Sequence, residues 1–116
     1  MENNEIINKL YAVIEDRKKN PPAKSYVASL FAGGVSAIAA KVEEEAAEFT
    51  EAAALDDEAH FIYEAADLFF HALVMLGEKG VRPEQVFAEL ARRFGISGID
   101  EKEARKHGGG YAAGQR

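Results

Sequence analysis

The chain has no cysteine, which excludes a disulfide framework and any metal site built on thiolates. It also has no uninterrupted apolar run approaching the roughly 18 to 20 residues that span a bilayer. The N-terminus, MENNEII, shows no signal-peptide pattern. We therefore expect a soluble, cytoplasmic protein without a membrane partner.

Basic residues are scarce as well. Fourteen Lys and Arg stand against twenty Asp and Glu, a net charge of -6, which argues against nucleic-acid binding because that function needs a basic face. With 116 residues and 47% hydrophobic content, the chain is long enough for one real core and too short for two. We assign residues 1–107 to one domain and residues 108–116, GGGYAAGQR, to a disordered glycine-rich tail.

Apolar residues recur at helical spacing, and neither strand alternation nor an internal repeat is visible, so the sequence predicts an all-α fold. Gly33 and Gly34 close a short apolar segment, and Ser36 is the expected cap of the long helix after them. Asp56 or Asp57 opens the next helix, which ends at Gly80. The expected helices cover residues 4–19, 25–32, 36 to about 55, 57–79 and 83–94, with a last short helix behind Asp100 in ISGIDEKEARK.

Two acidic pairs lie on the two long central helices: Glu45 with Glu48, and Glu64 with Asp67. At about 100° per residue, Glu45 falls inside the apolar stripe of its helix, whereas neighbouring acids such as Glu43 point away. A buried carboxylate without a partner costs several kcal/mol or becomes protonated. Glu45 therefore requires a salt bridge or a metal ion.

The second long helix is apolar on nearly every side except for one polar stripe, formed by His60, Glu64, Asp67 and His71. So short a chain has too few other helices to cover it. We predict a homodimer in which the two long helices pair with their copies to form a four-helix bundle. The alternative is a monomer in which the terminal helices provide the cover.

Carboxylates without a thiolate suit a hard divalent cation, Mg²⁺ or Mn²⁺ as its substitute. Such an ion neutralises phosphate charge and lowers the pKa of an attacking water, so metal-assisted phosphoanhydride hydrolysis is the reaction class that the acids favour. Acid pairs at this spacing are frequent on solvated helices, but here both pairs fall on buried or boundary positions. His71 is either a support for Asp67, a substrate contact or a core histidine. Tyr26 either lines a nucleotide pocket or serves packing.

Four segments, SYVASLF, AAKVEEEAAE, EAADLFFHALVML and SGIDEKEAR, occur in this order. Together they resemble the phosphoribosyl-ATP pyrophosphatase family of the all-α nucleotide pyrophosphohydrolases, the MazG-like superfamily, over roughly residues 7–105. The resemblance implies hydrolysis of phosphoribosyl-ATP to phosphoribosyl-AMP and pyrophosphate, the second step of histidine biosynthesis, with Mg²⁺ and in a homodimer. It also suggests a functional association with the cyclohydrolase of the next step.

The resemblance also implies roles for individual residues. The metal-binding acids of the superfamily match Glu45, Glu48, Glu64 and Asp67. Glu44 matches the first acid of the family's EE doublet, and we expect Glu44 or Glu45 to position the attacking water. The expected substrate contacts are Lys41, His71, Lys102 and Arg105.

Three alternatives stay open. A related pyrophosphohydrolase acting on noncanonical or deoxynucleoside triphosphates would share the acids but not the tail after SG. A di-iron bundle requires an E-x-x-H motif, but the residue three after Glu64 is Asp67. A purely structural dimerisation module predicts that Lys41 or another base neutralises Glu45 and Asp67, and that Mg²⁺ changes nothing.

Overall fold

The computed structural model describes residues 3–94, which form four helices: α1 (Asn3–Lys19), α2 (Tyr26–Ala52), α3 (Glu58–Lys79) and α4 (Pro83–Arg93). No strand occurs within this range, so the prediction of an all-α fold is confirmed. The expected last short helix, the glycine-rich tail, Lys102 and Arg105 lie outside the described residues.

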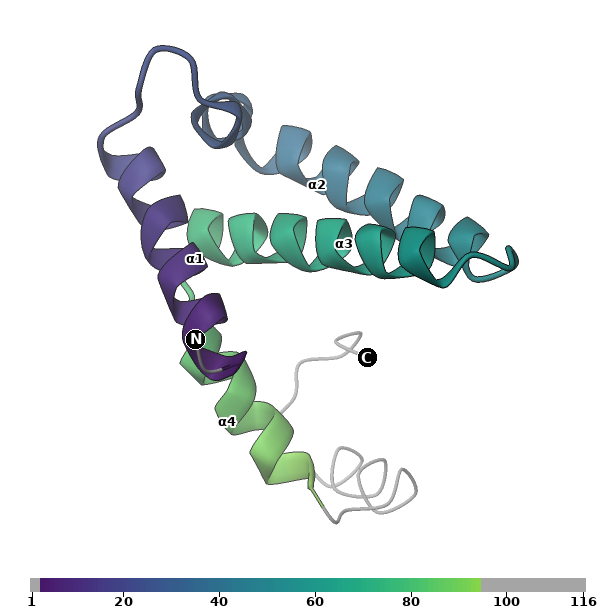
Figure 1. Ribbon diagram of the computed structural model, residues 1–116. Coiled ribbons are helices and arrows are strands. Elements are labelled where there is room, and N and C mark those ends of the chain that lie inside the picture. The colour runs from purple at the N-terminus through teal and green to yellow at the C-terminus, as the bar shows by residue number, and fades with distance from the viewer. Residues whose placement is uncertain (1–2, 95–116) are drawn as a thin grey trace. The chain divides into compact units, whose positions relative to one another are not determined.

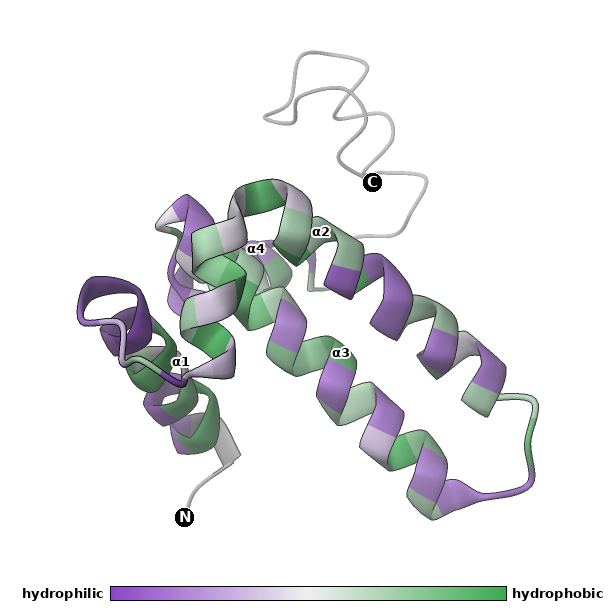
Figure 2. Cartoon of the chain, turned by 90° about the horizontal axis from the view of Figure 1, so that it is seen from above, coloured by the Kyte–Doolittle hydropathy of each residue, from purple (hydrophilic) through white to green (hydrophobic). Residues whose placement is uncertain are grey.

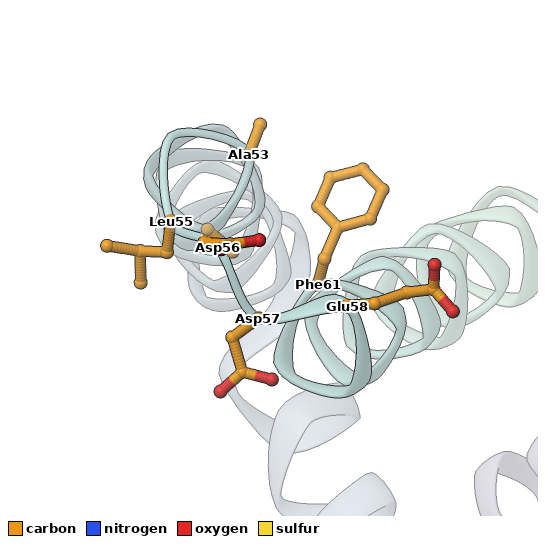
Figure 3. A pocket seen from close by; sticks show the side chains of 7 residues that line it. Ala53, Leu55, Asp56, Asp57, Glu58 and Phe61 are labelled. Carbon is orange, nitrogen blue, oxygen red and sulfur yellow. The ribbon is translucent and has the colours of Figure 1, made fainter.

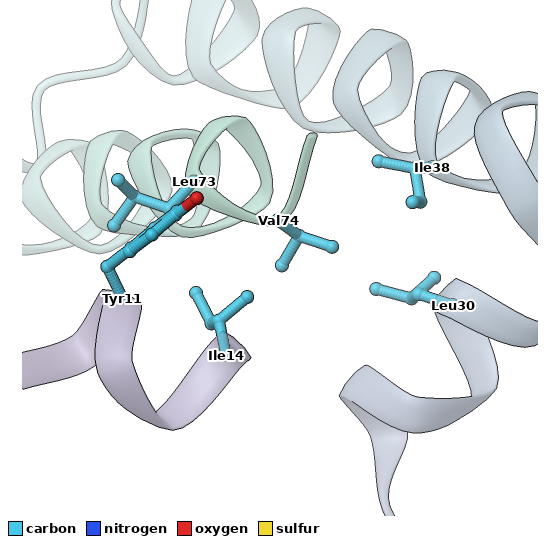
Figure 4. Packing of buried hydrophobic residues seen from close by; sticks show 6 residues of the cluster. All are labelled: Tyr11, Ile14, Leu30, Ile38, Leu73 and Val74. Carbon is cyan, nitrogen blue, oxygen red and sulfur yellow. The ribbon is translucent and has the colours of Figure 1, made fainter. Parts of the chain in front are cut away.

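Helices α2 and α3 form an antiparallel hairpin, and α1 crosses the C-terminal end of α3 (Figure 1). All three helices contribute to one core, in which Ile14, Ile38 and Val74 are completely buried. Gly77 allows the close approach of α1, because a Cβ atom there would lie 3.2 Å from Cγ2 of Ile14. Figure 4 shows the buried cluster: Tyr11, Ile14, Leu30, Ile38, Leu73 and Val74.

Two polar contacts reinforce the crossing of α1 and α3. The hydroxyl of Tyr11 donates to the carbonyl of Val81 at 2.6 Å. The Lys18 ammonium donates to the carbonyls of Gly77 and Glu78, at 2.9 and 3.2 Å. The carbonyls of Gly77 and Glu78 belong to the last turn of α3, where the helix dipole favours a cation. The Lys18 side chain of α1 therefore caps the C-terminal end of α3.

The caps of α3 are those that the sequence predicts. The Asp57 side chain accepts a hydrogen bond from the backbone N–H of His60 at 3.1 Å, and Gly80 ends the helix in the left-handed conformation, with φ 68°. A non-glycine residue adopts that conformation at a cost, so Gly80 defines a sharp end. The prediction for both ends of this helix is confirmed.

The start of α2 differs from the prediction. Ser25 is the N-cap, because its hydroxyl accepts a hydrogen bond from the N–H of Ala28 at 3.1 Å. The helix then bends at Gly34, whose φ of 73° and ψ of -167° are not helical, and resumes directly afterwards. Ser36 consequently lies inside the helix, so the expected cap at Ser36 is wrong. The glycine itself makes the bend that separates the first turns from the rest of α2 (Figure 1).

Within the described chain, the apolar surface of α3 is only partly covered, as expected for so few helices. Ile62, Tyr63 and Phe69 are about three-fifths exposed, at 58%, 63% and 63%. Figure 2 shows hydrophobic and hydrophilic residues alternating along this helix. By length and composition alone, α2 and α3 are each long and apolar enough to cross a membrane. Core helices of soluble proteins share these properties, so the finding is weak evidence for a membrane span.

The last helix, α4, belongs to a second unit that begins at Glu84, and we describe it separately. Pro83 occupies its first position, where the missing N–H costs no hydrogen bond. Near its end, a carboxylate oxygen of Glu89 lies 2.8 Å from both Nη2 of Arg92 and Nε of Arg93. These pairs stabilise the last turns of the helix locally.

Candidate metal centre

Carboxylates from α2 and α3 meet in the seam between the two helices. Oxygen atoms of Glu45, Glu48 and Glu64 lie within 4.8 Å of one another. Glu45 and Glu64 are only 5% and 6% exposed, and Glu48 is half-buried. The Oε2 atoms of Glu45 and Glu64 are buried without a hydrogen-bond partner among the described residues. Two such oxygens aimed into one acidic cluster require a cation or a proton.

Helical spacing explains why these acids meet. On α2, Ile38 and Ala52 are buried at either end of the stripe that contains Glu45. On the side towards the turn, the rings of Phe49 and Phe61 stack with their centroids 5.0 Å apart. The apolar contacts hold the two helices together and carry the carboxylates between them into a shielded position. The packing thereby forces the charges together.

The electrostatics of Glu45 reflect this crowding. Its pKa is raised above the ordinary value of 4.5, first by burial, then by hydrogen bonding with Glu48 and by the negative charges of Glu48 and Asp67. His71 acts in the opposite direction. Asp67 is half-buried and lies one turn beyond Glu64, outside the three-residue group whose oxygens converge.

Lys41 provides positive charge at the edge of the cluster. Its ammonium lies 3.3 Å from Oε1 of Glu44 and 3.5 Å from Oε1 of Glu45. Partial burial lowers the pKa of Lys41, but the hydrogen bond with Glu44 and the charges of Tyr26, Glu44 and Glu45 outweigh this effect and raise it above 10.5. A purely structural role predicts this contact with Glu45. The contact nevertheless leaves the second oxygen of Glu45 without a hydrogen-bond partner among residues 3–94.

His71 is buried beside the acids, with 4% of its surface exposed. Its Nδ1 lies 2.8 Å from the backbone carbonyl of Asp67, and its Nε2 lies 2.8 Å from the hydroxyl of Tyr26. The ring thus bonds the backbone of Asp67, not its carboxylate. Sequence reasoning missed the bond to Tyr26, because 45 residues separate the partners and no local pattern connects them.

A pocket of about 240 Å³ adjoins the acids. Glu48 and Glu64 form part of its wall, together with Glu51, Ala52, Leu55 and His60. A second pocket, of about 230 Å³, lies at the turn between α2 and α3 and contains none of the converging acids (Figure 3). The first pocket therefore offers the space for a ligand next to the carboxylates.

A divalent cation fits this donor set, because all its donors are carboxylate oxygens and two of them are buried without a partner in the described part of the chain. Fold and site together define a small all-α protein with a cluster of carboxylates between two antiparallel helices. Residues 7–94 match the phosphoribosyl-ATP pyrophosphohydrolase family, and the chain belongs to this family.

Relatives over almost the full length agree with this assignment. The chain is 48% identical to a phosphoribosyl-ATP pyrophosphatase of Geotalea daltonii, over 89% of this chain and 97% of the relative. It is 47% identical to the protein of that name from an Azoarcus species, over 89% and 96%. Identity to the Rhodospirillum rubrum protein of that name is 49%, over 88% and 87%.

Proposed function

We propose that this chain hydrolyses phosphoribosyl-ATP to phosphoribosyl-AMP and pyrophosphate, the second step of histidine biosynthesis, as a soluble cytoplasmic enzyme. The observation that carries this proposal is the convergence of buried, unpartnered carboxylates in a chain that matches the family over most of its length. The charge of a polyphosphate and the charge of this cluster repel each other. Substrate and protein therefore need a common cation.

Mg²⁺, with Mn²⁺ as a substitute, is the cation that we assign to the site, held by Glu45, Glu48, Glu64 and Asp67. The bound ion supplies neutralisation of phosphate charge and a lowered pKa of water. Glu44 or Glu45 positions the attacking water as a general base.

The proposed phosphate contacts are three cations, Lys41, Lys102 and Arg105. Lys41 reaches the edge of the cluster and offers a point charge to a phosphate group. Lys102 and Arg105 are proposed from the sequence as further phosphate contacts. His71 has a positioning role and does not contact the substrate, because both of its ring nitrogens are hydrogen-bonded within the protein.

The test is release of pyrophosphate from phosphoribosyl-ATP generated in a coupled assay, with Mg²⁺ and with a chelator. We expect metal-dependent turnover that far exceeds the turnover of deoxynucleoside triphosphates. Preference for the deoxynucleotides would assign the chain instead to the related pyrophosphohydrolases that act on noncanonical or deoxynucleoside triphosphates. Absence of turnover with every substrate would contradict an enzymatic role.

A homodimer accounts for the exposed apolar residues of α3. Ile62, Tyr63 and Phe69 lie on the helix that carries Glu64, and a second copy of α3 would cover them and complete a four-helix bundle. We expect sedimentation to give twice the chain mass of 12.6 kDa. A charge at the proposed interface, Phe69→Lys, is expected to shift the protein towards the monomer. A wild-type protein that sediments as a monomer at every concentration would contradict the proposal.

A further inference from the structure

The hydroxyl of Tyr26 is hydrogen-bonded to Nε2 of His71, a buried histidine on the helix that carries Glu64 and Asp67. The backbone carbonyl of Asp67 can only accept a hydrogen bond, so the Nδ1 of His71 at 2.8 Å carries the proton. In the neutral ring, Nε2 is then the acceptor, and the hydroxyl of Tyr26 donates to it at 2.8 Å. The only lone pair of this ring is thereby used inside the protein.

The position of His71 makes that lone pair important. His71 follows Asp67 by one helical turn and Glu64 by two, on the same face of α3. A neutral imidazole nitrogen is a ligand that Zn²⁺, Co²⁺ and Ni²⁺ take readily, whereas carboxylate and water oxygens suit Mg²⁺ and Mn²⁺. An Nε2 released from its hydrogen bond, one helical turn from Asp67, would therefore add a nitrogen ligand of the kind that such metal ions take.

Tyr26 reaches this nitrogen through the bend in α2. Ser25 caps the first turns of the helix, and the non-helical Gly34 lets these turns take a direction different from that of the rest. The rings of Tyr26 and His71 meet nearly edge to face, with centroids 5.8 Å apart and planes at 82°. Half of the Tyr26 side chain, 51%, stays exposed, so its hydroxyl bond and not its burial defines the contact.

We propose that Tyr26 determines the metal specificity of the site: by holding Nε2 of His71, it keeps an oxygen-only donor set and disfavours borderline transition metals. This inference rests on the proposed metal centre. Tyr26 acts here through His71, and so it is a positioning residue without contact to the ion. The absence of cysteine leaves imidazole as the strongest ligand for such metals in the chain.

The test compares metal binding by the wild type and by Tyr26→Phe, which keeps the ring and removes the hydroxyl. Dissociation constants for Mn²⁺ and Zn²⁺ are measured on metal-free protein by competition with a chromophoric chelator. We expect Tyr26→Phe to raise the preference for Zn²⁺ over Mn²⁺ by about tenfold or more, the scale on which groups behind a ligand affect metal affinity. The double variant Tyr26→Phe/His71→Gln should return to the wild-type preference. Thr50→Val removes the hydroxyl of an exposed residue of α2 that hydrogen-bonds the backbone of its own helix, and it should not change the metal preference.

A spectroscopic measurement tests the same bond without substrate. In ¹⁵N spectra of the imidazoles, we expect Zn²⁺ to shift Nε2 of His71 in Tyr26→Phe but not in the wild type. A shift in the wild type would overturn the inference even if the variant did not fold. Normal Mn²⁺ binding with an unchanged preference would overturn it too and leave the proposed function intact. A wild type that binds no Mn²⁺ would overturn the metal centre and the inference together.

Discussion

Replacing Glu64 by glutamine is expected to lower kcat/KM for phosphoribosyl-ATP at least about a hundredfold, because changes merely behind a metal ligand already cost about ten- to a hundredfold. The amide keeps the shape of the side chain but removes the charge of a buried carboxylate whose Oε2 has no partner in the described chain. We expect the folded structure to remain. Steady-state rates over a range of Mg²⁺ concentrations measure the loss, and thermal unfolding with and without Mg²⁺ shows whether stabilisation by the metal is lost as well.

The matched control is Glu43→Gln, the same change at an exposed acid of α2. Surface substitutions generally change free energies by less than about 0.5 kcal/mol, so kcat/KM should stay within about a factor of two. Similar losses in both variants would point to a general effect of net charge. Full activity of Glu64→Gln would show that Glu64 is not part of the metal centre.

Replacing Glu45 by glutamine is expected to reduce activity to a similar extent and yet to stabilise the metal-free protein at about pH 8. The pKa of Glu45 is raised, first by burial and then by Glu48 and Asp67. A carboxyl with a raised folded-state pKa contributes stability that is fully present below its unfolded pKa and is lost as the pH rises through the folded value. Glutamine does not titrate and keeps that stability.

Thermal unfolding midpoints in a chelator give the comparison. The variant should exceed the wild type at about pH 8, and the difference should shrink towards about pH 4, where the glutamate is protonated. Saturating Mg²⁺ should reverse the order, because a ligand at a hundred times its dissociation constant stabilises by about 2.7 kcal/mol. A less stable variant at high pH would mean that the ion pair with Lys41 dominates, as a purely structural role for Glu45 requires.

Local sequence patterns were sufficient to predict the helices and the burial of Glu45. Asp57 and Gly80 bound α3 through interactions within one turn, which sequence displays directly. Glu45 is buried as its place among apolar residues indicates. Gly33 and Gly34 correctly predicted an interruption of the helix. They did not show that the helix resumes directly after Gly34, which leaves Ser36 without a capping role.

Contacts between distant segments could not be read in this way. The bond from Tyr26 to His71 depends on the direction of the first turns of α2 after the bend, which no periodicity encodes. The exposure of Phe69 depends on what packs against that side of α3. Helical spacing alone cannot distinguish a face buried in the core of one chain from an apolar face that stays exposed in it.

The two ends of α3 are held by different contacts, so we expect them to differ in the free energy of local unfolding. At the C-terminal end, Tyr11 and Lys18 of α1 bond backbone carbonyls across the crossing of the helices. At the other end, the stacked rings of Phe49 and Phe61 join α2 to α3. Regions with few tertiary contacts open at lower free energy than the core does. Since α1 crosses only the C-terminal end of α3 (Figure 1), we expect the turn end of the hairpin to open before the crossing does, which would give solvent a route to the carboxylates.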